Sequence, residues 1–234
     1  MSVTERRPWA IVLASGREPD LASALACLRL VASPERTVVV VRRPAAGPRW
    51  SGTGLGGAAL IEEPADRGSA PGALAAALVA QEQDPAALVA LVRPGPAVED
   101  RSGFLRAWSS ALALAVRFPS RLVAVAPCGG GGPRPRGGRP GGMVMAGVAS
   151  VLLETARRAL PGAMRPLETF RQVLHAARHG RPVGDHQPLA LASAYARMQP
   201  ADLERDLLAA ARPPAIVPSV LPVLADGMSG ASRV

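Results

Sequence analysis

The residues best suited to ligand chemistry lie in one short stretch, Ile61 to Gly72, which reads IEEPADRGSAPG. The apolar run from Gly56 to Ile61 predicts a strand. Ser69 followed by Pro71 predicts the start of a helix, because serine is a good N-cap and proline fits the first turn. The free N–H groups of that turn, with Arg67 beside them, would suit a phosphate or a base carbonyl. A capped strand-to-helix turn that binds nothing is the alternative that the local chemistry leaves open.

The same stretch resembles the Q-P-x-N-R-x-T-A-P segment of bacterial mannose-1-phosphate guanylyltransferases, which join a sugar 1-phosphate to GMP taken from GTP. The residues in register with that segment are Glu63, Pro64, Asp66, Arg67, Gly68, Ser69, Ala70 and Pro71. In that family the segment lies along the nucleotide. With the opening loop included, the resemblance implies a nucleotide-binding set of Ser15, Gly16, Glu63, Asp66, Arg67, Gly68 and Ser69.

Further segments follow the order of that family, so the resemblance extends over most of the chain. Residues 9–16 look like the opening strand and glycine loop, and residues 91–104 look like the central strand and the helix after it. Residues 143–147, the helix ending in RRALP and residues 216–223 resemble the second half of the catalytic domain. The implied fold class is α/β, a Rossmann-like, mainly parallel sheet with helices on both faces, of the nucleotide-diphospho-sugar transferase type.

The chain departs from the family where phosphates and metal would be held. The family's opening loop reads G-G-x-G-x-R-L before a P-K pair, whereas this chain has Glu18 and Asp20 in that loop and no lysine anywhere. Those carboxylates would repel phosphates. Gly95 replaces the metal-binding aspartate of the P-S-D-H segment. In the W-S-D-x-G segment Gly227 takes the place of the aspartate, and Asp226 stands one residue early.

These replacements predict impaired or lost catalysis. Nucleotidyl transfer needs a divalent metal and cationic groups at the reacting phosphate, and Mg²⁺ prefers carboxylate oxygens. Removing one preorganised charge stabiliser lowers a rate by about 10²–10³. Mg²⁺ is therefore expected only if activity survives through displaced ligands, for which Asp20 and Asp226 are the candidates. Glu99 and Asp100 are better explained as first-turn and capping charges of the helix that follows.

Composition limits the other interpretations. With 234 residues, 48% of them hydrophobic, we expect a single nucleotidyltransferase-like domain over 1–234, with a Gly/Pro/Arg-rich linker at 128–142. The formal charge of +9 comes wholly from arginine, and asparagine is absent as well, which indicates a GC-rich coding bias more than an anionic partner. Two cysteines are too few for a disulfide framework. We find neither a signal region nor an apolar run of membrane length, which favours a cytoplasmic protein without a membrane partner.

Apolar runs of strand length alternate with alanine- and leucine-rich runs of helix length, the pattern of βα units. Strands are expected at 10–14, 37–41, 58–61, 88–92 and 122–126. Helices are expected at 21–31, 70–79, 102–116, 148–160, 167–177 and 202–211. Ligands of such sheets bind beyond the carboxyl ends of the strands. Residues 15–20, 62–69 and 93–97 should therefore converge on one rim.

Three functional hypotheses stay open. The first is an active nucleotidyltransferase. The second is a non-catalytic protein that binds a nucleotide or sugar nucleotide, alone, as a homo-oligomer or beside an active paralogue. The third is nucleic-acid binding through the 128–142 linker, which is disfavoured because that linker has no aromatic residue to stack on a base.

The chain has one pair of histidines at metal-binding spacing. His175 and His179 are four residues apart and could share one helix face, as metal-binding histidines do. No third ligand follows at a defining distance, and Gly180 should end the helix. The pattern therefore predicts an exposed pair in the last turn of a helix.

Overall fold

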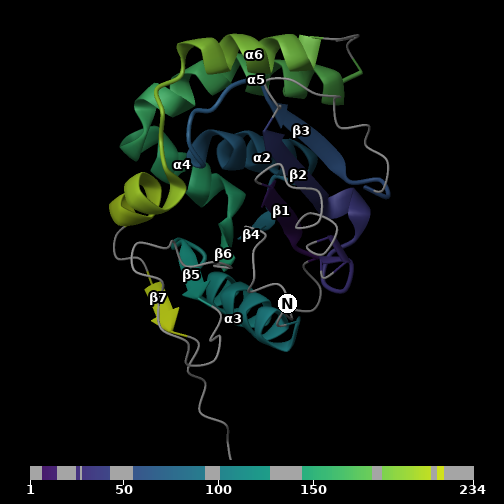
Figure 1. The fold of residues 1–234 in the computed structure, drawn as a ribbon, viewed down its shortest axis with the longest axis vertical. Helices are drawn as coiled ribbons and strands as arrows, with labels where there is room; N and C mark the ends of the chain where they lie inside the picture. Colours follow the sequence, from purple (N-terminus) through teal and green to yellow (C-terminus); the bar gives the residue numbers. More distant parts are fainter. Residues whose placement is uncertain are drawn as a thin grey trace, which may run out of the picture.

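The computed structural model describes residues 7–14, 25–26, 28–42, 55–92, 101–126, 144–180, 186–211 and 215–218. Within them seven strands form one sheet in the order β3-β2-β1-β4-β6-β5-β7 (Figure 1). The strands are β1 (Trp9–Ala14), β2 (Thr37–Arg42), β3 (Ala59–Glu63), β4 (Leu88–Val92), β5 (Val123–Ala126), β6 (Val144–Val148) and β7 (Ala215–Pro218). β6 runs antiparallel to β4 and β5, and the other neighbours are parallel. The expected mainly parallel α/β sheet is confirmed.

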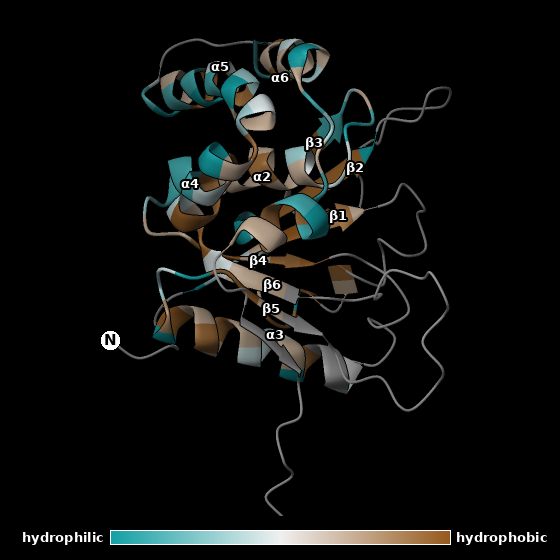
Figure 2. Ribbon diagram, turned by 90° about the vertical axis from the view of Figure 1, so that its left-hand side faces the viewer, coloured by the Kyte–Doolittle hydropathy of each residue, from teal (hydrophilic) through white to brown (hydrophobic). Residues whose placement is uncertain are grey.

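Helices cover both faces of this sheet (Figure 2). One face carries α2 (Ala70–Gln83), α4 (Ala149–Ala159), α5 (Pro161–Arg178) and α6 (His186–Arg197), and the opposite face carries α3 (Arg101–Arg117). Two shorter elements are the 3₁₀ turn η2 (Pro34–Arg36) and the π-helical turn η4 (Leu203–Leu208). None of the described helices is long and apolar enough to cross a bilayer.

Alternate residues of the strands supply two hydrophobic cores. Ile11 and Val40 pack in the core under α2, α4 and α5, whereas Val12 and Val39 pack with Trp108 of α3. Because both faces are buried, the strands read as continuous apolar runs and not as alternating ones. In Figure 2 the central strands are coloured as hydrophobic, whereas helices such as α4 and α5 mix hydrophobic and hydrophilic residues.

The predicted helix at 167–177 begins earlier in the structure, since α5 runs from Pro161 through Pro166. A proline inside a helix leaves the carbonyl four residues before it without its usual donor. Here that carbonyl belongs to Gly162, and it accepts a hydrogen bond from the backbone N–H of Gln199 at 3.1 Å. A tertiary contact thus replaces the missing helical hydrogen bond, which is why Pro166 does not mark the helix start.

Other differences concern elements without a strong local pattern. α6, β6 and β7 were not among the expected elements. The predicted helix at 202–211 is instead the π-helical turn η4, capped by Asp202, whose carboxylate accepts from the N–H groups of Glu204 and Arg205. Of the predicted helix at 21–31, residues 25, 26 and 28 are helical, and its first residues lie outside the described part, as does the whole 128–142 linker.

Substituting Gly68 with alanine should destabilise the protein strongly. Gly68 has a φ of 87°, and a Cβ there would lie 2.2 Å from the carbonyl oxygen of Ala201. Left-handed backbone costs a non-glycine residue about 1–3 kcal/mol, and the clash with backbone adds to it, so we expect a loss of at least about 2 kcal/mol in a urea titration.

Gly180→Ala is the matched control for Gly68→Ala. Its φ of 71° imposes the same backbone strain, but no atom lies within 4 Å of the added Cβ. The control should therefore lose only about 1 kcal/mol. Equal losses for the two variants would show that the contact with Ala201 does not constrain this turn.

Candidate functional site

The carboxyl ends of four neighbouring strands form one rim of the sheet. β3, β2, β1 and β4 lie side by side and run in the same direction. The strand order reverses at β1, so the topological switch point, where ligands of open α/β sheets bind, lies between β1 and β4. The turn after β3 stands two strands away from β1. The expected rim residues Ser15, Gly16 and Asp20 lie outside the described part of the chain, as do Gly95 and Asp226.

Asp66 is held by an arginine at the end of the neighbouring strand. Its two carboxylate oxygens lie 3.0 and 2.9 Å from Nη2 and Nη1 of Arg42, so the pair is bidentate. Oδ1 also accepts the N–H of Gly68 at 3.0 Å, which closes the turn. The pair is half exposed and adds little to stability. Its effect is to fix one guanidinium and one carboxylate on the rim.

Glu63 is buried, with 8% of its surface exposed, at the last position of β3. Its Oε1 accepts a hydrogen bond of 2.7 Å from the hydroxyl of Tyr195 in α6. Burial is the main cause that raises the pKa of Glu63, and the hydrogen bond from Tyr195 partly opposes it. Burial beside this carboxyl also raises the pKa of Tyr195. The structure therefore turns Glu63 toward α6.

The next two site residues contact the segment from Tyr195 to Leu203, which we call the 195–203 segment. Arg67 donates from Nε to the carbonyl oxygen of Tyr195 at 3.0 Å. The Ser69 hydroxyl lies 3.1 Å from Oδ2 of Asp202, as donor to that carboxylate, and it accepts the N–H of Leu203 at 2.9 Å. The nucleotide-facing turn expected from the sequence is thus packed against a segment far along the chain.

The expectation of free N–H groups at the start of α2 is wrong for its first residues. The N–H of Ala70 donates to the carbonyl oxygen of Ala201 at 3.1 Å, Pro71 has no N–H, and the N–H of Gly72 faces the Glu63 carboxyl. Ser69 has helical backbone angles and makes no side-chain cap to α2, since its hydroxyl is turned to Asp202. The outer guanidinium nitrogens of Arg67 have no partner among the described residues.

A magnesium ion would need carboxylates that are free to coordinate it. On the described part of the rim Glu63 is turned to Tyr195 and Asp66 to Arg42. The described residues contain no group of three or more acidic, histidine or cysteine side chains that could hold a metal. Glu63 and Asp66 therefore do not fit Mg²⁺, and Glu62 alone does not make a site for it among the described residues.

The histidine pair lies at the end of α5, as expected. The rings of His175 and His179 are 4.4 Å apart, the His175 side chain is 60% exposed, and its Nδ1 lies 3.2 Å from a carboxylate oxygen of Glu82. α5 ends at Arg178, and Gly180 follows with a φ of 71°. The prediction of an exposed pair in the last turn is confirmed.

Two important residues of this region were not identified from the sequence. Tyr195 and Asp202 hold the turn through contacts with residues more than a hundred positions earlier. Tyr195 is the chain's single tyrosine, which singles the residue out but does not indicate which part of the fold it contacts. Asp202 is the first residue of the helix expected at 202–211, and in the structure it caps η4 and also contacts Ser69.

Comparisons with known proteins give a structural match without a sequence match. No protein-family model matches the chain, and no curated protein matches it either. The structure is similar to that of mannose-1-phosphate geranyltransferase from Thermus thermophilus, with a TM-score of 0.55 and 18% identity over 86% of this chain and 71% of the other. Mannose-6-phosphate isomerase from Helicobacter pylori gives a TM-score of 0.49 and 11% identity, over 85% and 93% of the two chains.

The first similarity concerns the fold. It extends over most of this chain, and the sheet described above is the mainly parallel α/β sheet expected from the sequence. The chain therefore shares the α/β fold of that structure. Residue identity is too low to carry a reaction or a substrate from one protein to the other.

Glu63 should make stability depend on pH in a defined direction. Because burial raises its pKa, folding favours the protonated carboxyl, and this stability is lost as the pH rises through the folded-state pKa. The amide that replaces the carboxyl in Glu63→Gln cannot titrate. The free energy of unfolding of this variant, relative to that of the wild type, should therefore increase between about pH 4 and pH 7 in urea titrations.

Tyr195→Phe should have the opposite effect on this pH dependence. It removes the hydroxyl that stabilises the ionised carboxylate, so the loss of stability with rising pH should become steeper than in the wild type. If both variants kept the wild-type slope, the carboxyl of Glu63 would have to be solvated and not buried against α6.

Proposed function

We propose that this chain is a nucleotide- or sugar-nucleotide-binding protein with a mannose-1-phosphate guanylyltransferase-like site and impaired or lost catalysis. The observation that supports it most is the position of Arg67. The residue follows β3 on the carboxyl-end rim of a nucleotidyltransferase-like sheet, and its outer guanidinium nitrogens have no partner among the described residues. Such a group can bind a phosphate or a carbonyl oxygen through paired hydrogen bonds.

The proposed binding set divides into groups that contact the ligand and groups that position them. Arg67 is the contacting group of the described turn. Asp66 and Gly68 close the turn, and Glu63 and Ser69 fix it to the 195–203 segment. Ser15 and Gly16 stand directly after β1, which ends beside the switch point, and they are proposed to approach the phosphates from there.

Weak or absent transfer chemistry is proposed from the residues that would stabilise the reacting phosphate. The chain has no lysine, has Asp20 at the position of the phosphate-binding arginine, and has Gly95 at that of the metal-binding aspartate. In addition, the carboxylates of Glu63 and Asp66 contact other protein groups. These features favour ligand binding over catalytic turnover. A protein of this kind would act through its bound ligand or beside an active partner.

The proposal is tested by measuring binding and turnover on the same preparation. Calorimetric titration should detect binding of GTP or GDP-mannose, whereas release of pyrophosphate from GTP and mannose 1-phosphate with Mg²⁺ should stay close to the uncatalysed rate. Arg67→Ala should weaken binding at least about tenfold, the effect of losing a charge-assisted contact of about 1.4 kcal/mol. Arg67→Lys keeps the positive charge but loses the planar, forked guanidinium, so its affinity should lie between those of the wild type and Arg67→Ala.

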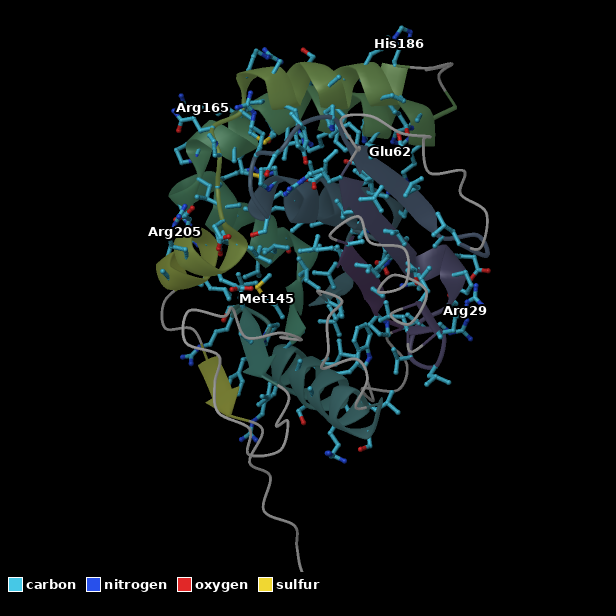
Figure 3. All side chains as sticks on the ribbon, in the orientation of Figure 1. Arg29, Glu62, Met145, Arg165, His186 and Arg205 are labelled. Carbon is cyan, nitrogen blue, oxygen red and sulfur yellow. The ribbon has the colours of Figure 1, made fainter. Side chains whose placement is uncertain are left out.

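Arg165→Ala is the matched control for Arg67→Ala, because Arg165 is an exposed arginine of α5 away from the rim (Figure 3). It should leave the affinity unchanged. Clear pyrophosphate release by the wild type would refute the loss of catalysis. Absence of binding by all tested nucleotides, or equal losses in the Arg67 and Arg165 variants, would refute the proposed site.

A further inference from the structure

A cavity of about 810 Å³ opens on the opposite side of β3 from its partner strand. β3 is the end strand of the sheet, and residues 59–62 form one wall of the cavity. The last turns of α2 and α5 and the first turns of α6 form the other walls. Pro64 of the turn after β3 also lines it, whereas Arg67, Gly68 and Ser69 do not, so the cavity adjoins the proposed nucleotide-binding turn but is lined by other residues than its contacting group.

The walls of this cavity are mainly apolar. Val79 of α2, Phe170 and Leu174 of α5 and Leu191 of α6 line it. Leu189 also lines it and is 64% exposed. Small-molecule sites usually measure about 300–1,000 Å³ and combine apolar walls with a few polar groups. In size and lining the cavity resembles such a site.

The charged side chains that line the cavity differ in whether they have a hydrogen-bond or ion-pair partner. Arg178 donates from Nη1 to the backbone carbonyl of Glu82, and the Glu82 carboxylate lies 3.2 Å from Nδ1 of His175. Glu62 also lines the cavity, and its side chain makes no hydrogen bond or ion pair with any described residue. Figure 3 places it below α6, beside β3. The lining thus holds two carboxylates against one guanidinium, and Glu62 is the unmatched one.

We propose that this cavity binds an elongated apolar molecule that carries a protonated amine, with the amine at Glu62 and the apolar body between α5 and α6. A buried apolar contact supplies affinity in proportion to the area removed from water, and the carboxylate selects the sign of the head group. The selection runs against the formal charge of +9, which by itself would attract anions. An apolar acid would place a third negative charge beside Glu62 and Glu82.

The test compares three amphiphiles with the same chain length, dodecylammonium, dodecanol and dodecanoate, below their micelle concentrations. Each is titrated against the full chain loaded with the neutral dye Nile red, and displacement is followed by fluorescence. Dodecylammonium should bind at least about tenfold more tightly than dodecanoate, with dodecanol between them. Glu62→Gln should abolish the preference for dodecylammonium over dodecanoate. Glu154→Gln, which makes the same charge change on the exposed surface of α4, should leave this preference unchanged.

A second pair of variants shows where the probes bind. Ala177 lines the cavity, and its neighbour Ala176 on the same helix does not. Ala177→Trp should fill the cavity and weaken the binding of dodecylammonium at least about tenfold. Ala176→Trp should leave its binding unchanged. Equal effects of the two tryptophans would mean that the probe binds elsewhere. Dodecanoate binding as tightly as dodecylammonium, or an order unchanged by Glu62→Gln, would overturn the amine specificity.

Discussion

The buried hydrogen bond between the Tyr195 hydroxyl and the Glu63 carboxyl is the contact on which the arrangement of the site depends. It is 2.7 Å long and joins the end of the edge strand β3 to α6, 132 residues later in the chain. Leaving a buried polar group without its partner costs about 1–3 kcal/mol, so the two elements are kept together. Arg67, Ser69 and Ala70 then bind the 195–203 segment around this bond. The turn after β3 is consequently held by contacts within the protein that do not need a ligand.

In the proposed site, this arrangement separates the groups that hold the turn from Arg67, the group proposed to contact the ligand. The main-chain donors at the start of α2 are used by the protein, so the anion site that a helix N-terminus usually offers is closed at Ala70. The side chain of Arg67 keeps its outer nitrogens, because only Nε is needed for the contact with Tyr195. Preorganisation of this kind lowers the entropic cost of binding. It favours a binding role, which does not require the metal and lysine that nucleotidyl transfer would need.

The sequence predicted the layers of the fold better than the contacts that order the site. Five strands were predictable because residues such as Val39 and Val40 are apolar on both faces of a covered sheet. Local patterns failed where tertiary contacts decide: the helix expected from residue 167 begins at Pro161, because Gln199 donates to the carbonyl that Pro166 leaves without its helical donor. The Glu63–Tyr195 contact was equally hidden, since neither residue has a local signal for a partner so far away. The resemblance in 63–71 is the basis of the proposed site, and the structure shows which contacts hold this turn.

Amide hydrogen exchange with and without GDP-mannose tests the central claim most directly, because it reports on the turn and on the rest of the sheet at once. The account predicts that the ligand slows exchange in residues 64–69 and in 195–203, which bind each other, and leaves α3 on the opposite face unchanged. Slower exchange confined to α3, or no change at 64–69 with the ligand bound, would contradict it.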